Sequence, residues 1–261
     1  MVDFIWMIRG GSFGFDFNVK LALTMVTIFI CLYDWKKNKR WDYFWVFLIG
    51  AIIWSLIELF NQLTGQRNMP NAILFGFEIP DFVAIPLQGI SEGAFVAVLG
   101  LFIADRLYNK AKWIGGLIGV LIILVPSALN LILNGIQIPD VGNPLIPSRR
   151  QMFTPAATIF FAIMVMITVV WFWKTNPEFR KRAYLLFASM LIIALIFTVF
   201  EYIGGTRWIE VGPLEGPWSR ALPLIEFGAL TYDIVVEIAA AYMPFLAIPC
   251  VLRLIKPIKT S

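Results

Sequence analysis

Residues 45–67 read WVFLIGAIIWSLIELFNQLTGQR, and this stretch decides the fold. The apolar run has the length of a membrane-spanning helix, which needs about 20 mostly apolar residues. Glu58 nevertheless places a carboxylate where the chain should still be inside the membrane, and Gly65 and Arg67 follow it. The same order of residue types returns at residues 201–207 as EYIGGTR. The stretch therefore predicts both a membrane span and an internal repeat of it.

The whole chain is as apolar as this stretch. Its 261 residues are 59% hydrophobic and have a mean hydropathy of +0.79, whereas soluble domains contain about 45–50% apolar residues. We therefore expect an integral, multi-pass membrane protein, located in the cell membrane. Residues 1–15 lack the basic start and compact apolar core of a secretory signal. We expect them to form a short interfacial segment, with Trp6 at headgroup depth.

The composition excludes several classes of site. Histidine is absent, which excludes histidine-ligated haem, histidine-based zinc hydrolases and Ser-His-Asp triads. Cys31 and Cys250 both lie in apolar runs and are interpreted as small buried hydrophobic residues. Neither a P-loop nor a dinucleotide-binding motif occurs. We expect no cofactor and no metal, and the net charge of +4 does not call for a nucleic acid partner.

Seven apolar runs predict an all-α protein with seven transmembrane helices. The spans are expected at about 17–34, 43–63, 82–104, 113–134, 155–173, 183–203 and 228–252. Most lysines and arginines fall in alternate connections and in the tail, at residues 34–42, 105–113, 174–182 and 253–261. Because basic connections stay in the cytoplasm, we expect the N-terminus outside and the C-terminus in the cytoplasm.

The order of features predicts a single transmembrane domain, residues 1–261, built from a 3+1+3 parallel repeat. Repeat 1 covers about 17–108, a linker helix about 113–134, and repeat 2 about 155–255. Each repeat has a span, a basic turn, a second span ending in glutamate, a glycine and arginine turn, and a third span carrying glutamate. Parallel repeats are related by an axis along the membrane normal.

This symmetry would bring Glu58 close to Glu201, and Glu92 close to Glu237. Ionisable groups inside a bilayer cost about 2.5–3.5 kcal/mol on insertion scales and mark functional sites by default. The candidate catalytic residues are the acids in or beside the spans: Glu226, Glu92, Glu237, Asp233, Glu58 and Glu201.

Asp233 and Glu237 are four residues apart and therefore share one helix face. Two carboxylates that close cannot both ionise cheaply, so one should keep its proton. Such a proton suits a general acid and equally a proton-coupled carrier. In the alternative structural interpretation, Glu58 and Glu201 pair with Arg67 and Arg207 at the interface. Glu92, Asp233 and Glu237 lack this explanation, because no basic residue is expected deep in any span.

Aromatic residues near the acids are the candidate substrate-binding residues. They are Trp54, Phe82, Trp208, Trp218, Phe227 and Tyr232. Asn130, in the fourth span, could hydrogen-bond across helices. The partner expected is a membrane lipid or another apolar small molecule, and the sequence is compatible with a homo-oligomer.

Two short motifs carry a resemblance to a known family. The first half has Trp54, Glu58 and Gly65 and then Pro86 and Glu92; the second has Glu201, Gly204 and Trp208 and then Pro223 and Glu226. This order resembles the three-span repeat of the membrane lycopene cyclases of archaea, fungi and some bacteria. The resemblance implies carotenoid biosynthesis, an isomerase or lyase type of ring closure. It also implies Glu226 as the acid, Glu92 as its partner, and Glu58 and Glu201 as orienting or relaying groups.

Three functions remain open at this point. A cofactor-free enzyme for acid–base chemistry on an isoprenoid or lipid predicts a lateral, aromatic-lined cavity in which two acids meet. A proton- or cation-coupled transporter of a small solute predicts a polar path to both faces. A non-catalytic membrane subunit predicts paired acids and no cavity.

Overall fold

The computed structural model describes residues 3–9, 17–68, 72–108, 112–143 and 148–255. Within these ranges seven helices, some continuous and some segmented, are long and apolar enough to cross a membrane. Four are single helices: α1 (Phe17–Asn38), α2 (Asp42–Leu63), α5 (Trp113–Asn134) and α6 (Pro155–Lys174). A further single helix is α7 (Pro177–Ile203). Asn176 is its N-cap residue, and the Asn176 side chain accepts a hydrogen bond from the backbone N–H of Phe179. The number of spans predicted from the sequence is confirmed.

The third and seventh spans are segmented. The third consists of α3 (Asp81–Gly89), a π-helical turn η2 (Ile90–Ala94) and α4 (Phe95–Tyr108). The seventh consists of α8 (Pro223–Tyr232), the π-helical η4 (Asp233–Ala240) and α9 (Pro244–Val251). π-Helical turns leave carbonyl groups without the usual helical partner and are frequent at functional sites. Here the Tyr242 hydroxyl donates to the carbonyl of Glu92 at 2.6 Å, and Thr168 donates to that of Ala240 at 2.9 Å.

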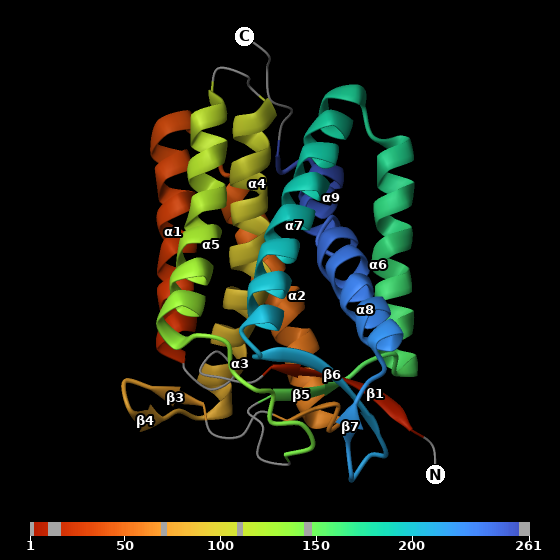
Figure 1. Cartoon of the computed structure of the whole chain (residues 1–261). Helices are drawn as coiled ribbons and strands as arrows, with labels where there is room; N and C mark the ends of the chain where they lie inside the picture. Colours follow the sequence, from red (N-terminus) through yellow and green to blue (C-terminus); the bar gives the residue numbers. More distant parts are fainter. Residues whose placement is uncertain (1–2, 10–16, 69–71, 109–111, 144–147, 256–261) are drawn as a thin grey trace.

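A small β-sheet covers one end of the helical bundle (Figure 1). Its strand order is β2 (Arg67–Asn68), β5 (Ser148–Gln151), β1 (Phe4–Arg9), β6 (Arg207–Gly212), β7 (Ser219–Arg220), and every neighbouring pair is antiparallel. A separate hairpin pairs β3 (Ile73–Leu74) with β4 (Phe77–Glu78). The protein is mostly helical, but the prediction of an all-α fold is wrong at this end.

The sheet includes part of the N-terminal segment, whose interfacial location stays a prediction. Residues 4–9 were expected to be interfacial, and they form the third strand of the sheet, between β5 and β6. The remaining residues of that segment, 1–2 and 10–15, lie outside the described residues. Pairing β1 with β6, about 200 positions later, satisfies backbone groups that a free interfacial segment would have to leave to water.

The chain crosses the bundle back and forth, so its connections alternate between two ends (Figure 1). We call them the sheet end, which carries β1 to β7, and the basic end, which carries the lysine- and arginine-rich turns. The first strand lies at the sheet end and the last helix, α9, finishes near the basic end.

A buried ion cluster ties helices together at the basic end. Arg182 of α7 has none of its surface exposed and contacts both oxygens of Asp105 at 2.7 Å. Its second partner is Asp42 of α2, at 2.9 Å. Tyr43 donates to Asp105 at 3.2 Å, and Arg40 lies 3.5 Å from the same carboxylate. The cluster thereby connects α2, α4 and α7.

Close backbone approach between α2 and the third span depends on glycine. A Cβ atom built at Gly93 would lie 2.5 Å from the Trp54 Cβ and 2.8 Å from the Gly50 carbonyl oxygen. Neither neighbour is the end of a flexible side chain. The contact brings η2, and with it Glu92, directly against α2.

We expect Gly93→Ala to lower the free energy of unfolding by about 1–3 kcal/mol, the usual cost of overpacking. Gly228→Ala in α8 is the matched control, because a Cβ there meets nothing within 4 Å, and alanine is the better helix former. Thermal unfolding in detergent compares the two. Equal stability of the two variants would contradict the close approach.

Candidate functional site

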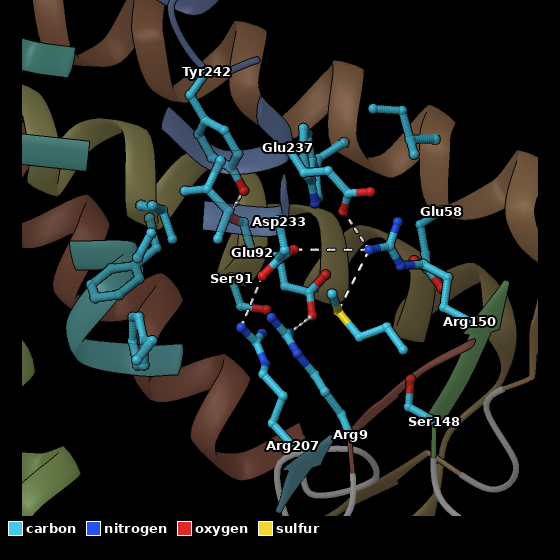
Figure 2. A pocket seen from close by; sticks show the side chains of 18 of the residues that line it. Arg9, Glu58, Ser91, Glu92, Ser148, Arg150, Arg207, Asp233, Glu237 and Tyr242 are labelled. Atoms are coloured by element: carbon cyan, nitrogen blue, oxygen red, sulfur yellow. Dashed lines mark hydrogen bonds and ion pairs between the residues drawn. The ribbon is translucent and has the colours of Figure 1, made fainter. Parts of the chain in front are cut away.

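Four arginines project from the sheet toward the bundle. Arg67 of β2 pairs in register with Arg150 of β5, and Arg9 of β1 pairs with Arg207 of β6. Four adjacent strands therefore each supply one guanidinium at the sheet end of the helices. Figure 2 shows Arg9, Arg150 and Arg207 extending from the sheet to the acids.

Arg67 and Arg9 hold the acids of α2 and η2. Arg67 lies 2.7 Å from Glu58 and 3.3 Å from Glu92. Arg9 lies 2.6 Å from Glu92. Lys20 of α1 is buried over the ring of Phe17, 3.8 Å from its centroid, and is near enough to interact electrostatically with Glu92.

Arg207 and Arg150 hold the acids of α7 and η4. Arg207 lies 2.8 Å from Glu201 and 3.0 Å from Asp233, and it also donates to the Thr198 hydroxyl at 2.7 Å. Arg150 contacts Glu237 directly and lies 3.9 Å from Asp233. Asp233 and Glu237 thus share Arg150, as the dashed lines in Figure 2 show.

The arginines remain charged in this setting. Burial by itself would lower the pKa of Arg67, but the carboxylates of Glu58 and Glu92 outweigh burial and hold that pKa above its usual value. The same balance raises the pKa of Arg150, mainly through Glu237, and of Arg207, mainly through Glu201. A buried guanidinium with two carboxylate partners is therefore a fixed cation.

These contacts decide two expectations from the sequence. The pairing of Glu58 with Arg67 and of Glu201 with Arg207 is confirmed. The expectation that nothing neutralises Glu92, Asp233 and Glu237 is wrong. Their arginine partners come from the strands that reach into the bundle from the sheet end, and Lys20 of α1 also lies near Glu92.

The charged residues surround a cavity of about 100 Å³, which is room for a few water molecules or for one end of a substrate. Its apolar wall includes Trp54, Phe95 and Phe197. Tyr242 also lines it, and its ring lies 4.6 Å from that of Trp54, centroid to centroid. We call this the charged cavity.

A second cavity of about 500 Å³ lies beside it, lined by α1, α5, α7 and residues at the sheet end. We call it the lateral cavity. Its size is within the range of small-molecule sites, and much of its lining is apolar, including Val19, Ile122 and Phe200. Arg9, Leu23, Phe197 and Glu201 line both cavities. The two spaces are therefore neighbours with common walls.

The charges divide unevenly between the two halves of the charged cavity. Among the described residues lining it, Glu201, Asp233 and Glu237 face Arg150 and Arg207. Glu58 and Glu92 face Arg9 and Arg67, with Lys20 close by. The α7–η4 half therefore holds one carboxylate more than it holds arginines.

Of the six acids predicted as catalytic, five line the charged cavity, and Glu226 does not. Glu226 begins α8 and accepts hydrogen bonds from the Ile209 backbone N–H at 3.2 Å and the Tyr202 hydroxyl at 3.4 Å. Arg220 of β7 lies 3.2 Å from it. The carboxylate therefore ties α8 to the sheet.

Of the six aromatic candidates, only Trp54 is among the residues lining the charged cavity. Phe82 and Phe227 are exposed on the outside of the bundle. Trp208 packs beneath the sheet and donates to buried Glu210 at 3.0 Å. Trp218 lies under the guanidinium of Arg149, 3.9 Å from it, and Tyr232 packs against Phe153.

The residues of the charged cavity that the sequence interpretation missed include Arg9, Arg150 and Tyr242, whereas Arg67 and Arg207 were expected as partners of Glu58 and Glu201. Arg67 and Arg207 follow the glycines in the repeated pattern. Arg9 and Arg150 carry no such signal.

Comparison with known proteins adds no assignment: no protein-family model, no curated protein and no solved structure matches the chain. The resemblance to lycopene cyclases therefore stays a prediction.

Proposed function

We propose that the protein is a membrane enzyme that uses its own carboxylates for acid–base chemistry on an isoprenoid or another lipid taken from the bilayer. The observation that carries the proposal is the uneven charge in the charged cavity. Three carboxylates share two arginines in the α7–η4 half, where Asp233 and Glu237 are buried. Like-charged carboxylates in such surroundings retain a proton.

The retained proton belongs to the pair Asp233 and Glu237. Asp233 lies 3.0 Å from Arg207 and 3.9 Å from Arg150, Glu237 contacts Arg150, and Glu201 contacts Arg207. A neutral carboxyl beside fixed guanidinium groups can protonate a double bond or a leaving oxygen. Glu58 and Glu92, each held by Arg67 across the cavity, can take a proton back. The acid and the base are thereby supplied by opposite halves of the chain.

The lateral cavity gives the route for the substrate. Its apolar lining suits a hydrocarbon chain, and the walls that it shares with the charged cavity bring one end of that chain to the acids. Aromatic faces at Trp54 and Tyr242 can stabilise a developing cation in the charged cavity.

The transporter alternative has less support. A solute path from the charged cavity to the basic end would have to pass the buried face of α7. There Leu186, Met190 and Ile193 are almost fully buried in the main hydrophobic cluster. The subunit alternative explains the ion pairs but leaves two adjoining cavities without a role.

The proposal includes an internal duplication and an orientation. In each half the third span is interrupted by a π-helical turn that carries a glutamate, Glu92 in η2 and Glu237 in η4. In each half a strand after the second span supplies an arginine, Arg67 or Arg207. The basic turns share the end away from the sheet, which supports a cytoplasmic basic end and an outer sheet end.

The proposal is tested by expressing the protein in two hosts, one that accumulates a linear carotenoid and one that does not. Extracted lipids are compared by mass spectrometry between the wild type and the double variant Asp233→Asn, Glu237→Gln. We expect at least one isoprenoid or lipid to be converted only with the wild type, and a cyclised carotenoid if the resemblance extends to the substrate. Identical lipids, with both proteins folded in the membrane, would contradict the proposed function.

A further inference from the structure

Polar side chains gather at the sheet end of the lateral cavity. Its lining there includes Ser127, Asn130, Asn134, Gln137 and Thr206, whereas its remaining walls are largely apolar. Asn130 and Asn134 lie on α5, one of the membrane-spanning helices, and are exposed rather than packed against another helix. Amide groups on a lipid-exposed span are costly unless a polar partner reaches them.

The backbone is built to hold this polar end in place. Gly135, with φ +69°, ends α5, and the chain then crosses the end of α7. The Gln137 backbone N–H donates to the Gly204 carbonyl at 3.1 Å. A Cβ at Gly205 would lie 2.0 Å from the Gln137 carbonyl oxygen, so the GG of EYIGGTR allows this close approach.

The side chains of Asn130 and Asn134 leave one donor group and one acceptor atom for a ligand. The Asn134 amide nitrogen donates to the Asn130 side-chain oxygen at 2.6 Å and to its carbonyl at 3.0 Å. Among the described residues, neither the Asn130 amide nitrogen nor the Asn134 side-chain oxygen makes a hydrogen bond. A hydroxyl group both donates and accepts, so one hydroxyl can satisfy both atoms.

The full charges that line the lateral cavity are already neutralised. Arg9 is paired with Glu92 at 2.6 Å, and Glu201 is paired with Arg207 at 2.8 Å. A charged headgroup would have to displace one of these partners, which would then remain as a buried unpaired charge. The available recognition groups are therefore amides and hydroxyls.

We infer that the lateral cavity binds a lipid alcohol, with its chain between α1, α5 and α7 and its hydroxyl on Asn130 and Asn134. This inference rests on the proposed function, because it names the substrate class for the same pair of cavities. It narrows that class from lipids in general to those with an uncharged, hydroxyl-bearing end.

The test measures binding to the full chain in phosphatidylcholine nanodiscs. Three probes share one C20 prenyl chain: the alcohol, the hydrocarbon and the monophosphate. Dissociation constants, expressed as mole fraction in the bilayer, come from displacement of the radiolabelled alcohol. We expect the alcohol to bind about tenfold more tightly than either other probe, the effect of about two neutral hydrogen bonds.

Asn130→Leu and Asn134→Leu should each weaken binding of the alcohol several-fold and leave the hydrocarbon unchanged. Leu129→Ala, on α5 but not among the lining residues, is the matched control and should change neither. If the monophosphate or the hydrocarbon binds as tightly as the alcohol to the wild type, the inference is overturned. That comparison stands even if an asparagine variant fails to fold.

The same preparation separates this inference from the proposed function. Asp233→Asn should bind the alcohol with an unchanged dissociation constant while it loses lipid conversion. Conversion of a lipid by a wild-type protein that shows no preference for the alcohol would refute the inference alone. Selective binding of the alcohol with no lipid conversion in either host would support the inference and refute the proposed enzyme.

Discussion

Replacing Arg182 with methionine is expected to lower the free energy of unfolding by about 3–5 kcal/mol, the cost of leaving a buried charge without its partner. Arg182 has none of its surface exposed and is the common partner of Asp105 and Asp42. Methionine fills a similar volume, so the loss comes from two carboxylates stripped of their main cation. Arg40, half-exposed and at 3.5 Å or more from both acids, can replace only part of it.

The measurement is unfolding of the purified protein in detergent, followed by circular dichroism. Lys181→Met is the matched control, because Lys181 is exposed and precedes Arg182 in the same helix. It should change the free energy of unfolding by less than about 1 kcal/mol. Replacing Asp105 with leucine in the Arg182→Met background should recover part of the loss. An Arg182→Met protein as stable as the control would show that the cluster does not hold the basic end together.

The spans could be predicted because each carries its own signal. A run of about 20 apolar residues is sufficient to identify a membrane helix, and α2 and α5 match the predicted ranges closely. The candidate acids could also be identified from the sequence, because a carboxylate is unusual within an apolar run. Five of the six that the sequence singled out line one cavity.

The sequence predicted the arginine partners of Glu58 and Glu201, but not those of Glu92, Asp233 and Glu237. β2 and β7 have two residues each, too few to show an alternating pattern. β1 and β5 pair across about 140 positions of sequence. Nothing in the sequence marks Arg9 and Arg150 as partners of these acids, which only the pairing of the strands brings close. The π-helical turns likewise leave no periodic signal, although they help to aim Glu92 and Glu237.

Glu226 shows how a motif can mislead about a site. It follows a proline at the start of a span, which made it the first candidate acid by resemblance. Its hydrogen bond from the Ile209 backbone and its contact with Arg220 give it a structural role at the sheet. Asp233 and Glu237, about two and three helical turns of sequence further on, reach the charged cavity instead.

Asp233→Asn and Glu237→Gln are each expected to lower the rate of lipid conversion by about 10²–10⁴-fold, the usual contribution of a positioned general acid. Both replacements keep the size and the shape of the side chain. Either one removes the excess carboxylate of the α7–η4 half, so the remaining acids and the two arginines balance without a proton. A site that holds no transferable proton cannot protonate its substrate, even though its shape is retained.

Glu226→Gln is the matched control for the loss of conversion. Glu226 is also a buried acid of the seventh span, but it lies outside the charged cavity. Its conversion rate should stay within a few-fold of the wild type, while its unfolding temperature falls with the weakened tie to β6. Rates are measured on the lipid that wild-type expression converts, with each variant checked for insertion and folding. If Glu226→Gln abolished conversion while Asp233→Asn and Glu237→Gln retained it, the acid would lie at the mouth of α8, as the resemblance implied. The uneven charge of the cavity would then have only a structural role, because its extra carboxylate would be dispensable for the reaction.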